Sequence, residues 1–391
     1  MTREKAGFGG VTAGRGRRDD QGVFFDPMIH SIHIIGSRQL GGAEQFYMRL
    51  VRALNRRGLS VLAVNRPGSA VNAALDHAVP QQTVAMRNGW DFFSALKIRR
   101  LIRSAGPSIV QTYMGRATRL TRLPRGAAAI HVARLGGYYK IKGYYQHARA
   151  WVGNTQDICD YLIREGLPAD RVYHIGNFVT LAPPPAAVAV QALRQSLQIP
   201  AEAVVLLALG RFIEKKGFAD LLSAFARVPR AIHGRPLMLV VAGDGPLQKP
   251  LHRQAGQLSL TSRMRWVGWQ NDPGPFYDLA DVLVCPSRQE PLGNVILEAW
   301  AHRLPVIATR TAGPLELVTA EENGLLVAIG DPLALAASIT ALIKAGPETW
   351  WNLAENGRRS VARHHSEEAV VQAYLALYAD LQPGLTAGTG R

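Results

Sequence analysis

The sequence predicts an α/β protein in which two doubly wound domains, each built on a parallel sheet, face one another across a cleft. The chain has 391 residues, about twice the length of a typical single domain. Short apolar strands alternate with amphipathic helices, a pattern typical of a parallel sheet covered on both faces. The alternation stops at a proline-rich segment near the middle of the chain and then begins again, so we expect two sheets.

The first block is expected to span residues 28–183. Apolar residues recur at helical spacing along its first helix and predict one buried face. Gly58 marks the end of that helix. The expected elements are, in order, a strand at 32–35, a loop at 36–42, a helix at 43–57, and strands at 61–64, 108–112 and 127–133.

The segment Leu181-Ala182-Pro183-Pro184-Pro185 is interpreted as the interdomain linker. A proline-rich stretch is stiff and cannot enter a central strand. The second block is therefore expected to span residues 184–382. Its expected elements are strands at 204–209, 237–242, 283–285 and 305–309, helices at 217–227 and 294–301, and a last helix at 367–381 that follows a break at Gly346-Pro347.

The two ends of the chain differ from these blocks. Residues 1–27 are rich in Gly, Arg and Asp, and we expect a disordered tail there, or sequence upstream of a start at Met28. Residues 383–391 are expected to form a second tail. Cys159 and Cys285 lack metal-ligand spacing and are expected to be reduced. No signal peptide and no bilayer-length apolar run is found, so we expect a cytoplasmic protein.

Positive charge is concentrated in the first block. The formal net charge is +16, and residues 28–183 hold 21 Lys and Arg against seven Asp and Glu. This half is expected to face an anionic membrane surface, a phosphorylated glycolipid or nucleic acid. Cations near the aromatic and apolar stripe of residues 90–101 are predicted to contact the acceptor or the membrane; they are Arg99, Arg100, Arg103, Arg116, Arg119 and Arg122, and Arg125 continues the three-residue spacing of the last three. The alternative is the solvated face of an ordinary helix.

Three segments carry the candidate chemistry. The first is Gly41-Gly42-Ala43-Glu44, between a strand and a helix. Glycine lets the backbone approach a ligand closely, and the unpaired amides of a helix start attract an anion. A strand-to-helix turn also needs glycine for steric reasons alone.

The second segment is 210–217, where Arg211 and Lys216 flank a loop at the carboxyl edge of the sheet and could hold a diphosphate. Two solvated loop cations are the alternative.

The third segment, Glu290 to Ala299, is the most specific. Two carboxylates, Glu290 and Glu298, stand on either side of a glycine turn and a helix start. Glu298 lies about one turn inside the helix, where a carboxylate can accept hydrogen bonds from both hydroxyls of a ribose. The amides of Gly293 and Asn294 open the helix and are expected to face a diphosphate or a sugar. A helix start with favourable acidic residues is the alternative.

The order of these motifs resembles that of the retaining glycosyltransferases of family 4, which have the GT-B fold. The shared motifs also include Gly243-Asp244-Gly245-Pro246, Ala312-Gly313-Pro314 and Asn323-Gly324-Leu325. The resemblance spans nearly all of residues 28–382. It implies two Rossmann-like domains, the first for the acceptor and the second for a nucleotide sugar, with a C-terminal helix that returns to the first domain.

The resemblance also implies residue roles. Arg211 and Lys216 would bind the diphosphate, Glu298 the ribose and Glu290 the donor sugar, and Gly41 or Gly42 would approach the phosphate. The loop with Gly243 and Gly245 and the stretch around Trp269 would border the base. Gly210, Leu292, Gly293 and Asn294 belong to the same donor-binding motifs.

One position departs from the family pattern. Many relatives place a histidine at the end of the strand that faces the sugar, whereas this strand reads Ile130-His131-Val132-Ala133-Arg134. Arg134 is predicted to take that place as a catalytic residue. His131 is predicted to point elsewhere, because a strand histidine is more often a core residue. The segment from His131 to Lys142 is similar to bacterial lipopolysaccharide and capsule glycosyltransferases.

The predicted reaction needs neither a metal nor another cofactor. The chain has no Asp-x-Asp pair and no His/Cys cluster with ligand spacing. Protein cations and helix amides would then neutralise the leaving diphosphate. The resemblance implies retention of anomeric configuration, a UDP-linked donor and a glycan or lipid-linked acceptor. The charge of the first block favours a place at the inner face of the cytoplasmic membrane. The rival functions are a sugar-nucleotide epimerase of the same architecture and a basic nucleic-acid-binding protein; no nucleic-acid partner is expected.

Overall fold

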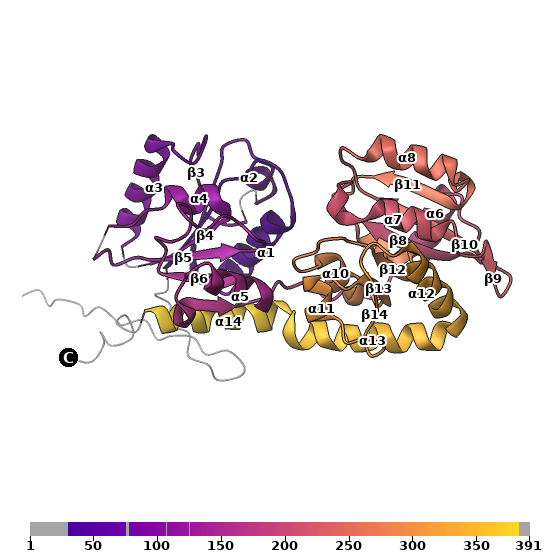
Figure 1. Cartoon of the computed structure of the whole chain (residues 1–391). Helices are drawn as coiled ribbons and strands as arrows, with labels where there is room; N and C mark the ends of the chain where they lie inside the picture. The colour runs from indigo at the N-terminus through magenta and orange to yellow at the C-terminus, as the bar shows by residue number, and fades with distance from the viewer. Residues whose placement is uncertain (1–29, 76–77, 107, 125, 383–391) are drawn as a thin grey trace, which may run out of the picture.

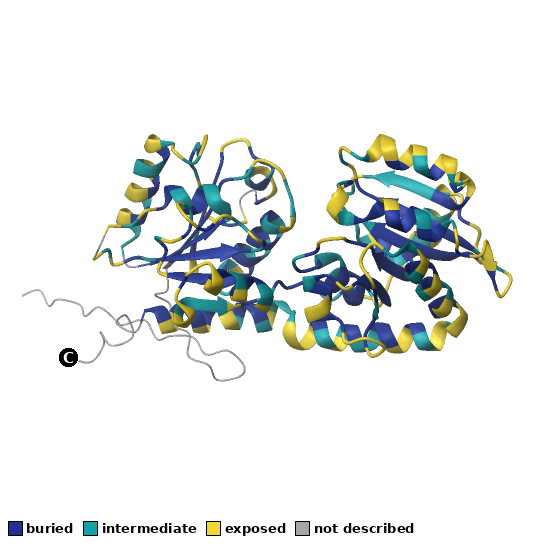
Figure 2. Ribbon diagram, viewed as in Figure 1, coloured by how far each residue is buried: buried dark blue, intermediate teal, exposed yellow. Residues whose placement is uncertain are grey.

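The computed structural model describes residues 30–75, 78–106, 108–124 and 126–382, and it confirms the predicted fold class. The tails expected at residues 1–27 and 383–391, the start at Met28 and the side chain of Arg125 lie outside the described residues. Two α/β domains stand side by side, each with buried strands at its centre and exposed helix faces outside (Figures 1 and 2).

The first domain is a parallel sheet in the order β3-β2-β1-β4-β5-β6-β7. The strands are β1 (His30–Ile35), β2 (Ser60–Asn65), β3 (Gln81–Thr83), β4 (Ile109–Tyr113), β5 (Ile130–Leu135), β6 (Ala150–Gly153) and β7 (Val172–His174). The helices are α1 (Gly42–Arg56), α2 (Ala70–Leu75), α3 (Phe92–Ala105), α4 (Met114–Leu120) and α5 (Gln156–Arg164), with a 3-10 turn at Ala169–Arg171.

The second domain repeats the plan with the order β11-β10-β8-β12-β13-β14, and a short antiparallel strand, β9, beside β10. The strands are β8 (Val204–Leu209), β9 (Ala231–Ile232), β10 (Arg235–Ala242), β11 (Met264–Gly268), β12 (Val282–Cys285), β13 (Val306–Thr309) and β14 (Leu325–Val327). The helices are α6 (Ala187–Ser196), α7 (Phe218–Phe225), α8 (Gln248–Gln257), α9 (Gly274–Leu279), α10 (Asn294–Ala301), α11 (Ala312–Leu317) and α12 (Pro332–Ala345), with 3-10 turns at Glu214–Lys216 and Thr261–Arg263.

The described part of the chain ends in two long helices that lie beneath the domains (Figure 1). They are α13 (Pro347–His364), under the second domain, and α14 (Glu367–Leu381), under the first. Gly346-Pro347 was interpreted only as a break, so α13 was not predicted. Proline is favoured in the first turn of a helix, because its missing N–H would be unpaired there anyway, so Pro347 starts a helix here.

Helix α14 belongs to the core of the first domain. Tyr374 and Tyr378 are fully buried there with residues of α1 and β4. The Tyr378 hydroxyl donates to Gln111 Oε1 over 2.7 Å. The chain passes between the domains twice, near Val179 and near His365. The Val179 amide donates to the His365 carbonyl oxygen over 3.0 Å and so joins these two segments. The linker predicted at 181–185 contains no helix or strand.

The structure also differs from the prediction in the start of one strand and in short strands that were not predicted. The strand expected at 127–133 begins only at Ile130, because the chain first makes a turn in which the Ala127 amide donates to the Pro124 carbonyl oxygen. Strands β3, β6 and β7 were not predicted, since each has only three or four residues and too few side chains to show a period.

Helix α13 contacts α10 through a glycine. A Cβ added at Gly357 would lie 2.2 Å from the Trp300 ring, which is fully buried. We therefore expect Gly357→Ala to lower the free energy of unfolding by about 1–3 kcal/mol, because the two helices must move apart. Gly256→Ala in α8 is the control, since a Cβ there meets nothing within 4 Å. Urea unfolding should show that this control is neutral or slightly stabilising; equal effects of the two changes would contradict the packing account.

Candidate active site

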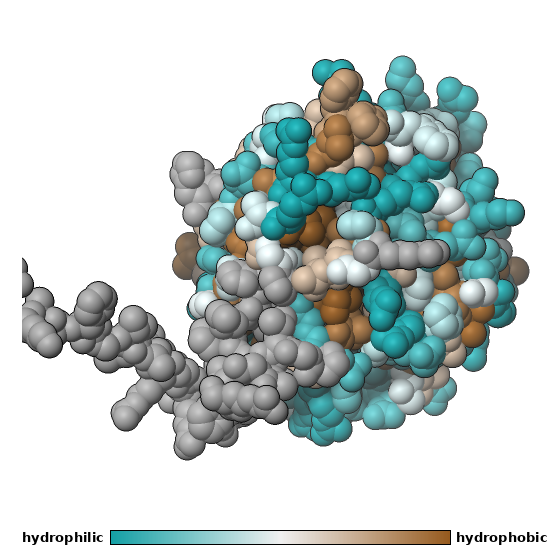
Figure 3. Space-filling view, turned by 90° about the vertical axis from the view of Figure 1, so that its left-hand side faces the viewer, coloured by the Kyte–Doolittle hydropathy of each residue, from teal (hydrophilic) through white to brown (hydrophobic). Residues whose placement is uncertain are grey.

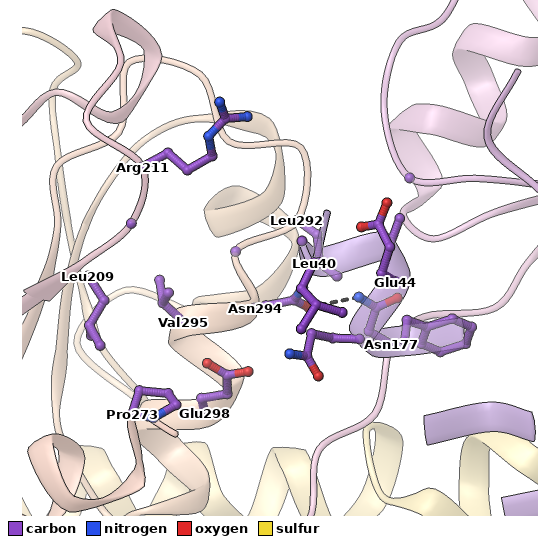
Figure 4. Close-up of a pocket in the computed structure, with 18 of the residues that line it drawn as sticks. Leu40, Glu44, Asn177, Leu209, Arg211, Pro273, Leu292, Asn294, Val295 and Glu298 are labelled. Atoms are coloured by element: carbon purple, nitrogen blue, oxygen red, sulfur yellow. Dashed lines mark hydrogen bonds between the residues drawn. The ribbon is translucent and has the colours of Figure 1, made fainter. Parts of the chain in front are cut away.

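A cleft of about 630 Å³ lies between the two domains. Its walls come from the loop before α1, the ends of β5, β8 and β10, and the start of α10. Figure 4 shows Arg211 and Glu298 on the side of the second domain and Glu44 across from them on the first. The cleft brings together most of the predicted donor and catalytic residues: Gly41, Gly42, Arg134, Gly210, Arg211, Lys216, Gly243, Trp269, Glu290, Leu292, Gly293, Asn294 and Glu298.

Gly245 is the predicted donor residue that does not line the cleft. Its φ is +148°, and an added Cβ would lie 2.8 Å from both the backbone nitrogen and the backbone oxygen of Phe212. The glycine is needed because two loops pack backbone against backbone. Gly243, in the same loop, lines the cleft and also packs tightly against backbone: a Cβ there would lie 1.9 Å from the Gly210 carbonyl oxygen.

Two helix starts meet in the cleft. Helix α1 follows Gly41 and α10 follows Gly293, and neither cap residue has a side chain to bond the first amides. Gly293 has a φ of +96°. A Cβ added at Gly42 would lie 3.0 Å from Asn294 Nδ2, so the two starts approach closely. The unpaired amides and the positive ends of both helices therefore face the same space, an arrangement that favours the binding of an anion.

Lys216 and Glu290 form an ion pair at this site. Lys216 Nζ lies 2.5 Å from Glu290 Oε2, which also accepts from the Ser287 hydroxyl over 3.0 Å. Burial by itself would lower the pKa of the Lys216 ammonium, but the Glu290 carboxylate more than offsets this, and the pKa lies above its ordinary value. Lys216 is therefore charged at neutral pH. Arg211 is exposed and has no ion-pair partner among the described residues.

Glu298 is held from both domains. Its Oε2 accepts from the Tyr277 hydroxyl over 3.0 Å, and its Oε1 accepts from Arg49 Nη2 over 3.3 Å. Sequence reasoning missed Arg49 and Tyr277. A signal for Arg49 existed, because it lies seven residues after Gly42 and so on the same face of α1; Tyr277 gave none. Glu44 also lines the cleft, with an exposed fraction of 6% and no hydrogen bond of its carboxylate to other described residues.

Comparisons with known proteins agree with this geometry. Residues 40–182 match the family described as Glycosyltransferase Family 4, and residues 190–360 match Glycosyl transferases group 1. The chain is 36% identical over 341 residues to the lipopolysaccharide core biosynthesis glycosyltransferase LpsE of Rhizobium meliloti, a match that covers 87% of this chain and 96% of LpsE. LpsD of the same organism is 34% identical, over 86% of this chain and 95% of LpsD.

The chain belongs to glycosyltransferase family 4. The fold agrees with that of solved glycosyltransferases. Anabaena Alr3699/HepE, in complex with UDP and glucose, has a TM-score of 0.78 at 20% identity and covers 90% of this chain and all of its own. A Rickettsia africae glycosyltransferase has a TM-score of 0.80 at 18% identity, over 91% of this chain and all of its own. Both domains are therefore those of a GT-B enzyme.

In this glycosyltransferase Arg134, and not His131, lines the cleft. Most of the Arg134 guanidinium is engaged by the protein: Nε donates to the Tyr374 hydroxyl over 3.0 Å, Nη2 donates to Asn177, and Phe46 lies 3.7 Å beneath it. Asn177 in turn donates to Asn294 Oδ1 over 2.7 Å, drawn as the dashed line in Figure 4. Arg134 thus connects α14, the interdomain segment and the start of α10.

The six arginines predicted to contact the acceptor or the membrane do not line the cleft of the glycosyltransferase. Arg116 is half-buried, and its Nη1 donates to the carbonyl oxygens of Gly36 and Met86. Arg119 lies between the rings of Trp90 and Tyr144. Arg99, Arg100, Arg103 and Arg122 are exposed. No helix of the described residues has the length and apolar character needed to cross a bilayer, and no three His, Cys, Asp or Glu in that part gather as metal ligands would.

His131 is buried, with its Nε2 2.9 Å from the Thr112 hydroxyl. Burial, with a smaller effect of His147, lowers the pKa of His131 from 6.5 to about 3. The unfolded chain therefore binds one more proton than the folded chain between these pH values, and stability falls as the pH drops below 6.5.

His131→Gln should reduce the stability lost between pH 7.5 and 5.5 by about 1.4 kcal/mol. Urea unfolding at both pH values measures this, with the exposed His233→Gln as control; an unchanged loss would contradict the buried neutral state.

Proposed function

We propose that this glycosyltransferase moves a sugar from a UDP-linked donor to a lipopolysaccharide core or related cell-surface glycan, with retention of anomeric configuration. The assignment of a nucleotide-sugar donor rests on the charges in the cleft. The cations Arg211 and Lys216 and the starts of α1 and α10 lie there beside the carboxylates of Glu290 and Glu298. The relatives LpsE and LpsD, named for lipopolysaccharide core biosynthesis, support the acceptor class, and HepE with bound UDP supports the nucleotide.

The donor would lie across the second domain. Arg211 and Lys216 hold the diphosphate, together with the amides that open α1 and α10. On binding, the diphosphate draws the Lys216 ammonium from Glu290, which frees that carboxylate for the hydroxyls of the donor sugar. Glu298 accepts from the ribose hydroxyls, and Gly243 and Trp269 border the base; Trp269 is 46% exposed at the rim.

The transfer step follows from this placement. The acceptor hydroxyl oxygen attacks the anomeric carbon on the face from which the diphosphate leaves, so the configuration is kept. The new glycosidic bond forms as the bond from the anomeric carbon to the diphosphate oxygen breaks. A phosphate oxygen receives the acceptor proton. Arg211, Lys216 and the helix amides stabilise the negative charge on the leaving group, and no metal or other cofactor is needed in this scheme.

Removal of Arg211 tests this role. Arg211→Ala should lower kcat about 100-fold, the effect of losing one preorganised charge-stabilising donor. The assay measures transfer from UDP-glucose, UDP-galactose and UDP-N-acetylglucosamine to truncated lipopolysaccharide, and NMR of the product reports the anomeric configuration. Lys215→Ala is the matched control, because Lys215 is an exposed cation of the same loop that does not line the cleft. Unchanged turnover of Arg211→Ala, or an inverted product, would contradict the proposal.

A second surface supports peripheral attachment to the inner face of the cytoplasmic membrane. Trp90, Phe92 and Phe93 are 80%, 66% and 81% exposed, on and just before α3, at the edge of the first domain far from the second. Hydrophilic and apolar side chains lie side by side on this face in Figure 3. The surrounding cations are Lys97, Arg99, Arg100, Arg103, Arg119 and Arg122. Exposed aromatic rings among cations suit an anionic lipid surface.

Vesicle binding tests this surface. The protein should co-sediment with vesicles of phosphatidylglycerol and phosphatidylcholine at low salt and be released by high salt. The double change Arg99→Glu/Arg100→Glu should abolish most of the binding. The same change at Arg227 and Arg230, exposed cations of the second domain, is the control and should have little effect. Equal loss in both variants, or no binding of the unchanged protein, would contradict membrane attachment.

A further inference from the structure

Arg49 joins the two domains at the carboxylate that the proposed function assigns to the ribose. It lies in α1, and its Nη2 donates across the cleft to Glu298 Oε1 of α10 over 3.3 Å. Its Nη1 donates to the Phe178 carbonyl oxygen over 3.2 Å, in the segment that connects the domains. The guanidinium is thus fixed at two points and does not swing freely as a surface arginine would.

Tyr277 fixes the other side of the same carboxylate. Its hydroxyl donates to Glu298 Oε2 over 3.0 Å. The ring is fully buried, and burial together with the charge of Glu298 raises the pKa of Tyr277 well above its ordinary value. The phenol therefore stays protonated and acts as a donor. With one donor on each oxygen, the plane of the Glu298 carboxylate is set before any nucleotide arrives.

An ionised carboxylate has about four lone-pair positions. Arg49 and Tyr277 use one on each oxygen, which leaves one on each oxygen for a further donor. All three side chains line the cleft, so the remaining positions are accessible to a ligand there. Two hydroxyls on adjacent carbons, such as those of a ribose, match the two remaining acceptors.

We propose that Arg49 is a positioning residue for ribose recognition, which holds Glu298 from the first domain so that its free lone pairs meet the 2′ and 3′ hydroxyls of the nucleotide. This inference rests on the proposed function of Glu298. It adds that the nucleotide site, although built on the second domain, is complete only when the first domain supplies Arg49. Nucleotide binding and the relative position of the domains are therefore coupled through one ion pair.

The ion pair between Arg49 and Glu298 is expected to affect ligand recognition more than the stability of the fold. The exposed fractions of the two side chains are 35% for Arg49 and 23% for Glu298, and exposed pairs of this kind contribute little to stability by themselves. Its effect should appear in ligand recognition, where a preorganised acceptor loses less conformational freedom on binding. Thermal stability without ligand should therefore change little when Arg49 is replaced.

Calorimetry with two nucleotides tests the inference. UDP and 2′,3′-dideoxy-UDP differ only in the hydroxyls that Glu298 would receive. Arg49→Met, which keeps the apolar stem, should weaken UDP about tenfold, as expected for a hydrogen bond to a charged group, and leave dideoxy-UDP unchanged. The discrimination between the two nucleotides should fall by the same factor. Arg49→Lys keeps a charge but cannot donate to both acceptors in the same way, and it should give an intermediate ratio.

Arg52→Met is the matched control, because Arg52 lies on the same helix and its Nη2 donates to the Ala74 carbonyl oxygen. It should leave both affinities unchanged. A ratio unaffected by Arg49→Met, equal weakening of both nucleotides, or tighter UDP binding would overturn the inference. If the unchanged protein binds both nucleotides equally, the proposed role of Glu298 fails, and the inference fails with it.

Discussion

The ion pair between Lys216 and Glu290 is the interaction on which the rest of the site depends. The ammonium is largely buried and would be unfavourable there without its partner at 2.5 Å. The cleft therefore holds a neutralised pair, and in the function we propose a bound diphosphate would supply the negative charge in place of Glu290. Under that proposal one exchange of partners would both bind the anion and free a carboxylate for the sugar.

Close backbone contacts hold this pair in place. A Cβ at Gly217, directly after Lys216, would lie 1.9 Å from the Pro286 carbonyl oxygen, and one at Gly313 would lie 2.2 Å from the Leu292 carbonyl oxygen. The Gly313 amide also donates to the Glu290 carbonyl oxygen over 2.9 Å. The loops on either side of Lys216 and Glu290 thus touch through glycines. Any side chain at these positions would push the charged groups apart, so the glycines belong to the site although they need not touch a ligand.

Much of the fold could be predicted from the sequence, because long apolar strands such as β8 and amphipathic helices such as α1 carry their own period. Short strands and α13 could not, since three-residue strands show no period and Pro347 was equally compatible with a break. Lys216, Glu290 and Glu298 could be predicted because they lie in contiguous motifs, and their ligand roles remain a proposal. Arg49 and Tyr277 could not be assigned from motifs. They approach Glu298 from 249 and 21 residues away along the chain, and only the tertiary structure brings such distant groups together.

We propose that protein charges, held by this framework, bind a nucleoside diphosphate without help from a metal ion. Isothermal titration of the purified protein with UDP, once in EDTA and once in excess Mg²⁺, tests it most directly. We expect the same affinity in both conditions and a large loss in EDTA when Lys216 is replaced by methionine. Binding that appears only when the divalent ion is present, or no binding of UDP, ADP or GDP at all, would contradict the account.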